Sequence, residues 1–183
     1  VKQEDYLNKI FSSATSLLGL INDILDFSKI EAGKLDMEAI DFSLDDVFDN
    51  VTNLIALKAQ EKDLELLIQN PRDLPQYLIG DPLRLGQILI NLSNNAVKFT
   101  KKGQIVIQTK VIEQEPSKIT LQFAVQDTGI GLSEEQIGKL FQSFSQADTS
   151  TTRKFGGSGL GLTITKSLVE MMNGKIWVKS ELG

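Results

Sequence analysis

The chain has 183 residues, of which 41% are apolar, and its 19 Lys and Arg against 24 Asp and Glu give a net charge of −5. It contains no cysteine and no histidine, which excludes disulfides, thiol catalysis, His–metal sites and Ser–His triads. The acidic balance disfavours nucleic acid as a partner, and no apolar run approaches the roughly 20 residues of a membrane span. These features predict a soluble intracellular module of one main domain.

The first predicted element is one long amphipathic helix over about residues 3–30. Its apolar residues recur at close to seven-residue spacing from Leu7 to Leu25. Because no second long helix of matching pattern follows, we expect this stripe to belong to a helix bundle that other sequence completes. A core-facing helix of the same domain is the alternative. Gly33 is the expected C-cap.

Helices and strands alternate in the rest of the chain. The apolar and turn patterns predict strands over 35–42, 64–69, 77–80, 103–113 and 118–126, and one from Lys175. Further helices are predicted over 43–61, over 81–99, near Glu134 and up to Met172. The expected fold is an α/β (α+β) two-layer sandwich, in which helices cover one face of a mixed, mostly antiparallel sheet.

Three polar residues lie on a flank of the predicted helix that follows Asp81. Asn91, Asn95 and Lys98 are spaced i, i+4 and i+7. Two amide oxygens one turn apart can ligate a hard cation such as Mg²⁺, which also takes phosphate oxygens, and the lysine can attract a phosphate. The alternative is a polar flank that hydrogen-bonds a neighbouring loop.

Asp127, Gly129 and Gly131 follow directly on a predicted strand. An aspartate at a strand end can accept a hydrogen bond from an exocyclic amine such as that of adenine, and the glycines let the backbone approach a planar ligand. A plain turn has the same composition.

The glycine-rich segment 156–162 leads straight into a helix. Free N–H groups at a helix N-terminus suit phosphates, although the spacing fits neither a P-loop nor a Rossmann site; a flexible linker is the alternative. The hydroxyl-rich stretch before it follows Phe141 and Phe144. We expect it to be a lid from which Arg153 and Lys154 reach a phosphate, or an ordinary surface loop.

These segments resemble the N, G1, F and G2 boxes of sensor histidine kinases, in that order: 91–100, 127–131, 141–144 and 157–161. The junction Leu-Asp-Phe-Ser-Lys-Ile-Glu-Ala-Gly-Lys at 25–34 is also similar to that of hybrid kinases. The resemblance covers nearly the whole chain. It implies the second helix of a dimerisation domain at 1–33 and a Bergerat-type catalytic ATP-binding domain at 34–183.

The resemblance also implies roles for single residues. Asn91, Asn95 and Lys98 would be catalytic, with Mg²⁺ bridging the two asparagines to the phosphates of ATP. Asp127 would bind the adenine amine in a pocket that Gly129 and Gly131 shape. The other expected nucleotide contacts are Phe144, Arg153, Lys154, Gly157, Ser158, Gly159, Leu160 and Gly161.

The implied reaction is transfer of the ATP γ-phosphoryl group to a histidine, and then to an aspartate in the receiver domain of a response regulator. Gyrase-like, mismatch-repair and chaperone ATPases carry a glutamate four residues before the metal-binding asparagine. Asn91 occupies that position here, and an amide cannot take a proton from water. The substitution therefore favours a kinase over an enzyme that hydrolyses ATP.

The acceptor histidine is absent from the chain. We therefore expect no autophosphorylation of the isolated chain, whose substrate histidine would come from dimerisation helices of the same or another protomer of a homodimeric parent. The chain is expected to begin past the first dimerisation helix and to stop before a last Gly-rich turn. A cytoplasmic location is expected, with other segments as possible inner-membrane anchors of the parent. The alternatives are a non-catalytic nucleotide-sensing or scaffolding module and a serine or protein kinase of the same superfamily.

Overall fold

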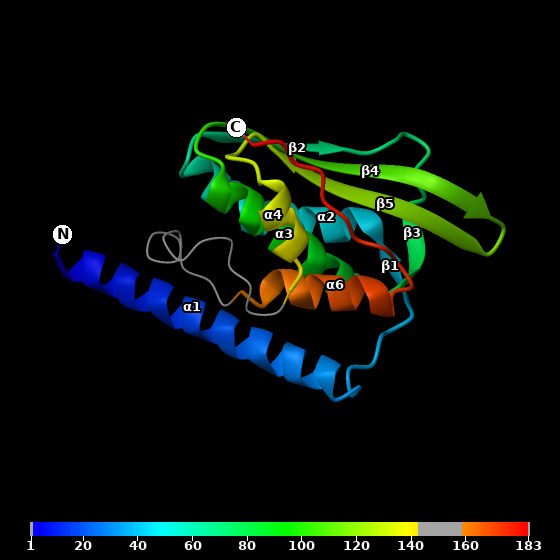
Figure 1. The fold of residues 1–183 in the computed structure, drawn as a ribbon, viewed down its shortest axis with the longest axis horizontal. Coiled ribbons are helices and arrows are strands. Elements are labelled where there is room, and N and C mark those ends of the chain that lie inside the picture. Colours follow the sequence, from blue (N-terminus) through cyan, green and yellow to red (C-terminus); the bar gives the residue numbers. More distant parts are fainter. Residues whose placement is uncertain (1, 143–158, 183) are drawn as a thin grey trace. The chain divides into compact units, whose positions relative to one another are not determined.

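The computed structural model describes residues 2–142 and 159–182 (Figure 1). Its elements in chain order are α1 (Lys2–Glu31), β1 (Ile40–Ser43), α2 (Leu44–Gln60), β2 (Leu64–Gln69), β3 (Tyr77–Gly80), α3 (Pro82–Phe99), β4 (Gly103–Glu115), β5 (Lys118–Asp127), α4 (Glu134–Lys139) and α6 (Gly161–Met171). The chain divides into two compact units, Val1–Asp36 with Gly138–Lys175 and Met37–Ile137 with Ile176–Gly183.

In the first unit, α1 is the single long helix that the heptad pattern predicts. Gly33 has a φ of +62°, its N–H donates to Ile30 O at 2.9 Å, and Lys34 N–H donates to Lys29 O at 2.8 Å. This pair of bonds is the Schellman ending that glycine favours, so the predicted C-cap is confirmed. The apolar stripe of α1 is exposed, with Phe11 at 75% and Leu18 at 61%.

The stretch Lys9–Glu31 of α1 is long and apolar enough to cross a membrane by length and composition alone. From the sequence, we expected no apolar run close to the roughly 20 residues of a membrane span. The difference arises because average hydropathy does not separate the two faces of an amphipathic helix. A bundle helix passes the same test, so this finding does not by itself indicate a membrane span.

In the second unit, side-chain caps start the helices where the sequence predicts them. Ser43 Oγ accepts a hydrogen bond from Asp46 N–H at 3.4 Å at the start of α2. The buried carboxylate of Asp81 accepts from Arg84 N–H at 2.9 Å and from Glu38 N–H at 3.0 Å. Asp81 therefore begins α3 and also fixes the chain that leads into β1.

The described strands of this unit form two sheets. β1 pairs antiparallel with β3, and the second sheet has the order β2–β4–β5, with β2 parallel to β4 and β4 antiparallel to β5. The predicted hairpin of 103–113 and 118–126 is thus confirmed. The strand predicted from Lys175 is wrong for residues 175–182, because a strand requires a hydrogen-bonded neighbour and this segment forms no ladder with the described strands.

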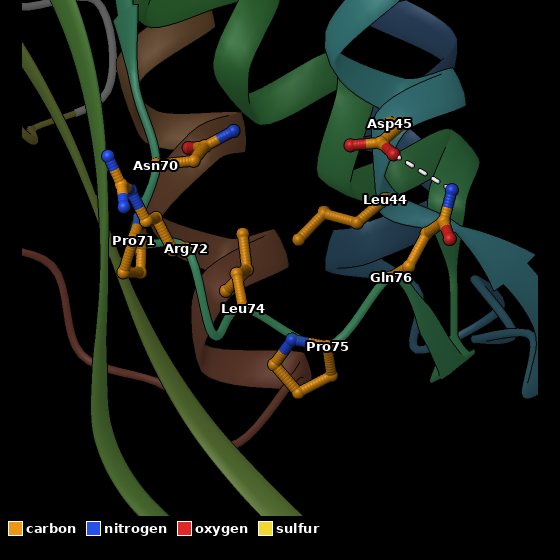
Figure 2. A pocket seen from close by; sticks show the side chains of 8 residues that line it. All are labelled: Leu44, Asp45, Asn70, Pro71, Arg72, Leu74, Pro75 and Gln76. Atoms are coloured by element: carbon orange, nitrogen blue, oxygen red, sulfur yellow. Dashed lines mark hydrogen bonds between the residues drawn. The ribbon is translucent and has the colours of Figure 1, made fainter.

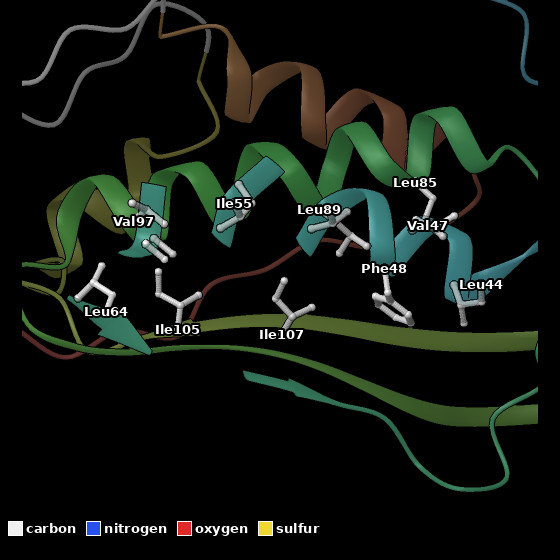
Figure 3. Close-up of a cluster of buried hydrophobic side chains, with 13 residues drawn as sticks. Leu44, Val47, Phe48, Ile55, Leu64, Leu85, Leu89, Val97, Ile105 and Ile107 are labelled. Carbon is white, nitrogen blue, oxygen red and sulfur yellow. The ribbon is translucent and has the colours of Figure 1, made fainter. Parts of the chain in front are cut away.

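The core lies between the β2–β4–β5 sheet and the two helices α2 and α3 that cover one face of it (Figure 3). Ile55 of α2, Leu89 of α3 and Ile107 of β4 are fully buried there. Each such side chain contributes about 1.5–3 kcal/mol on burial. This confirms the predicted layer of helices on one face of a mixed sheet and holds α3 rigidly against β4 and β5.

Candidate functional site

Helix α3 presents the polar flank that the sequence predicts. Leu85, Leu89 and Ala96 are buried on its core side, whereas Asn91, Asn95 and Lys98 are half-buried. The neighbouring Asn94 is bound by another helix, because Lys58 Nζ of α2 donates to its Oδ1 at 2.8 Å. The two expected metal ligands, Asn91 and Asn95, therefore lie on the same helix and are partly shielded from solvent.

Lys98 carries the positive charge of this flank. Its ammonium lies 4.9 Å from the centroid of the Phe99 ring and is partly removed from water. Burial lowers the pKa of Lys98 from its ordinary value, because desolvation disfavours the charged form. An anion bound beside the ammonium would reverse this penalty, so the environment of Lys98 suits a phosphate.

The turn after β5 is held by its own side chains. Asp127 Oδ1 accepts from Gly129 N–H at 2.9 Å, which fixes the orientation of the carboxylate. Thr128 Oγ1 accepts from Gln104 N–H at 3.1 Å and lies against Gly103, which has a φ of +112° and where an added Cβ would overlap Thr128 Oγ1. The turn that the sequence predicts is present, and it is tied to the start of β4.

Gly129 brings this turn against the last turn of α3. A Cβ added at Gly129 would lie 2.9 Å from Phe99 O and 2.6 Å from Asp127 Oδ1. Gly131 has a φ of +67°, and a Cβ there would overlap the carbonyl oxygen of Glu181. Both glycines are therefore required by close backbone approach, and two of the predicted motifs meet at the end of α3.

Two further residues make contacts that the sequence reasoning missed, Lys62 at this end of α3 and Ser180 just after the Asp127 turn. Lys62 Nζ, from the turn between α2 and β2, donates to Val97 O at 2.7 Å and to Lys98 O at 3.1 Å. Ser180 Oγ accepts from Leu132 N–H at 2.9 Å. Neither residue belongs to a recognisable motif, and the sequence carries no signal for contacts between such distant segments.

The predicted phosphate loop is described only at its end, in the first unit. Gly159 has a φ of +69°, Leu160 is buried, and α6 begins at Gly161 with no side-chain hydrogen bond at its N-cap. The other predicted contacts lie outside the described residues: Phe144, Arg153, Lys154, Gly157 and Ser158.

The donor set of α3 is suited to a metal that arrives with its own ligands. Among residues 2–142 and 159–182, no group of three or more His, Cys, Asp or Glu could hold a metal ion. Two amide oxygens alone are too few for an all-protein site. They fit Mg²⁺, which commonly takes one or two protein oxygens together with phosphate oxygens and water.

A separate cavity of about 300 Å³ lies at the start of α2 and the loop before β3 (Figure 2). Gln76 Nε2 donates to Asp45 Oδ2 at 3.0 Å at its edge, and the side chains of Leu44 and Leu74 line it. None of the predicted site residues lines this cavity, so it is distinct from the flank of α3.

Comparison with protein families gives two matches. Residues 80–183 match the family described as histidine kinase-, DNA gyrase B- and HSP90-like ATPase. Residues 1–33 match the His kinase A phospho-acceptor domain.

Similar curated proteins are sensor kinases from bacteria and a eukaryote. The chain is 52% identical over its full length to the sensor histidine kinase GacS of Pseudomonas protegens and 48% identical over 98% of its length to the signal transduction histidine-protein kinase BarA of Escherichia coli. It is 44% identical to hybrid signal transduction histidine kinase B of Dictyostelium discoideum. The chain spans 20% of the length of GacS and of BarA.

Solved structures of histidine kinases share the fold. Full-length ShkA in complex with AMPPNP matches 100% of this chain and 37% of its own, at a TM-score of 0.82 and 31% identity. The nucleotide-free catalytic domain of ThkA matches 79% of this chain and 88% of its own, at a TM-score of 0.63 and 27% identity.

Proposed function

The chain belongs to the family of histidine kinase-, DNA gyrase B- and HSP90-like ATPases, and we propose that residues 34–183 form the catalytic ATP-binding domain of a sensor histidine kinase, with 1–33 a part of its dimerisation domain. One observation carries the assignment: Gly129 packs against Phe99 O. This contact joins the Asp127 turn to the helix end that bears Asn95 and Lys98, so one nucleotide can reach both.

Each end of ATP has a matching partner in this arrangement. The Asp127 carboxylate, oriented by Gly129 N–H, accepts from the exocyclic amine of adenine. Asn91 and Asn95 would hold Mg²⁺ through their amide oxygens, and the ion would supply positive charge to neutralise the phosphate oxygens. Lys98 supplies a further positive charge. Phe144, Arg153, Lys154 and the segment 157–161 complete the proposed contacts.

In the proposed reaction, an imidazole nitrogen of an added histidine attacks the γ-phosphorus. The bond from phosphorus to the bridging oxygen breaks, ADP leaves, and the phosphoryl group later passes to an aspartate of a response-regulator receiver domain. The residues of this chain bind and orient ATP, which supplies most of the rate in such transfers. Asn91 offers no general base to water, which protects ATP from hydrolysis.

Substitutions in the two motifs test the site. Asn95→Ala and Asp127→Ala should each abolish Mg²⁺-dependent ATP binding, because one removes a metal ligand and the other the acceptor for adenine. Titration calorimetry measures the affinity. Asn94→Ala is the matched control. Because Asn94 binds Lys58, this substitution should leave the affinity for ATP unchanged. Affinity like that of the unaltered chain in both site variants would contradict the assignment.

Transfer to an added substrate tests the chemistry. With radiolabelled ATP, the isolated chain should stay unlabelled because it contains no histidine, whereas an added histidine-bearing helix pair should acquire label. If ATP binds but no transfer occurs, the alternative of a nucleotide-sensing scaffold is favoured. The receiver-domain partner, the homodimeric parent and the cytoplasmic location belong to the same proposal.

A further inference from the structure

Lys62 binds the end of the helix that carries the proposed nucleotide contacts. The last carbonyl groups of a helix lack partners within it, and in α3 Ala96 O is taken by Thr100 N–H. The next two, Val97 O and Lys98 O, accept from Lys62 Nζ at 2.7 and 3.1 Å. One ammonium group from outside the helix therefore donates hydrogen bonds to two consecutive carbonyl oxygens.

The following carbonyl of α3 faces the nucleotide-site turn. Phe99 O lies where a Cβ of Gly129 would be only 2.9 Å away. The last turn of α3 is consequently bounded by Lys62 at Val97 and Lys98 and by the Asp127–Gly129 turn at Phe99. A shift of the last turn of α3 would displace Lys98 and the backbone against which Gly129 packs.

We propose that Lys62 is a positioning residue for the nucleotide site, on the premise that α3 and the Asp127 turn bind ATP as proposed above. It acts in two ways through the same contacts. Its two hydrogen bonds fix the last turn of α3 next to the Asp127 turn. Its charge also offsets the negative partial charge at the C-terminal end of α3, which would otherwise oppose an anionic phosphate near Lys98.

A purely structural role predicts a different result, and the chain offers a control for it. Lys58, in the last turn of α2, makes a comparable bond between α2 and α3, from its Nζ to Asn94 Oδ1 at 2.8 Å. It does not touch the terminal carbonyls. If these lysines merely join two helices, removing either should affect folding stability alone.

The experiment measures Mg–ADP affinity of the chain by titration calorimetry, together with the thermal unfolding midpoint. Lys62→Met, which keeps the aliphatic stem, should weaken affinity about three- to tenfold, the size expected for losing charge-assisted bonds at a partly exposed helix end. Lys62→Arg, which keeps charge and donors, should restore affinity to within about twofold. Lys58→Met should leave affinity unchanged.

Two outcomes overturn the proposal: Lys62→Met binding like the unaltered chain, or Lys58→Met weakening affinity as much as Lys62→Met. If Lys62→Met does not fold by circular dichroism, Lys62→Gln decides instead, because glutamine keeps an NH₂ donor group while removing the charge, and it must weaken affinity. Failure of the premise that α3 and the Asp127 turn bind ATP can be distinguished from failure of the proposal for Lys62, because Asn95→Ala would then bind nucleotide like the unaltered chain.

Discussion

Lys98 is a single side chain through which pH should affect both folding stability and the proposed nucleotide binding. Desolvation lowers its pKa in the folded chain, so between that lowered value and the ordinary lysine value the unfolded chain binds more protons. Free energy of unfolding therefore increases with pH across this window. A bound phosphate favours the protonated ammonium, which gives nucleotide affinity the opposite dependence.

We predict that nucleotide affinity falls as pH rises through the lowered pKa of Lys98, before the exposed lysines lose their charge. Lys98→Met should weaken affinity at neutral pH and remove this early alkaline decline, because no charge is left to titrate. Calorimetric titrations at increasing pH check this. An unchanged alkaline decline in Lys98→Met would assign the pH dependence to another group.

Among the elements, the junction of α3, β4 and β5 determines the geometry of the site. The β4–β5 hairpin places the end of β5 opposite Ile105 near the start of β4, and Thr128 ties the next turn to Gln104. Gly129 then contacts Phe99 of α3. Three elements thus converge on one turn, with no space for a larger residue.

Gly129→Ala should therefore lower nucleotide affinity at least about tenfold and destabilise the chain by roughly 1–3 kcal/mol, the usual range for overpacking. The added methyl group must displace Phe99 O or the Asp127 carboxylate. Calorimetry and denaturant unfolding measure the two effects.

Gly138→Ala is the control, because an added Cβ there meets nothing within 4 Å. It lies in the short helix α4, so the change should be neutral or slightly stabilising. Equal losses in both glycine variants would show that the close contact at Gly129 is unimportant.

At the scale of the whole molecule, the exposed apolar stripe of α1 is the feature that bears on assembly. Leu7, Ile10 and Phe11 are between 64% and 75% exposed, and Leu17, Leu18, Ile24 and Leu25 between 52% and 61%. Such a surface needs a partner, in accord with the match of residues 1–33 to a phospho-acceptor domain.

Leu18→Glu should therefore reduce self-association of the chain, because it places a charge within the stripe. Analytical ultracentrifugation over a range of concentrations measures it. Leu57→Glu on α2 is the control: Leu57 is exposed to a similar extent, 65%, but stands outside the stripe. Association that survives Leu18→Glu would place the contact elsewhere.

Much of the architecture could be predicted from local chemistry. The caps at Ser43 and Asp81 and the ending at Gly33 depend on short-range hydrogen bonds that adjacent residues determine. The strand predicted from Lys175 fails for the opposite reason, because alternation of side chains does not supply a neighbouring strand. The same distinction applies to the candidate site. The sequence was sufficient to identify the motif residues, but not to predict the distances between them in three dimensions.

The sequence by itself determined the family resemblance, the order of the nucleotide motifs and the absence of an acceptor histidine, since these depend only on residue type and spacing. Only the tertiary structure decided that Gly129 packs on Phe99 and that Lys62 binds the end of α3. These contacts join segments far apart in the chain, and their formation depends on the packing of α2 and α3 on the sheet, which no local pattern encodes.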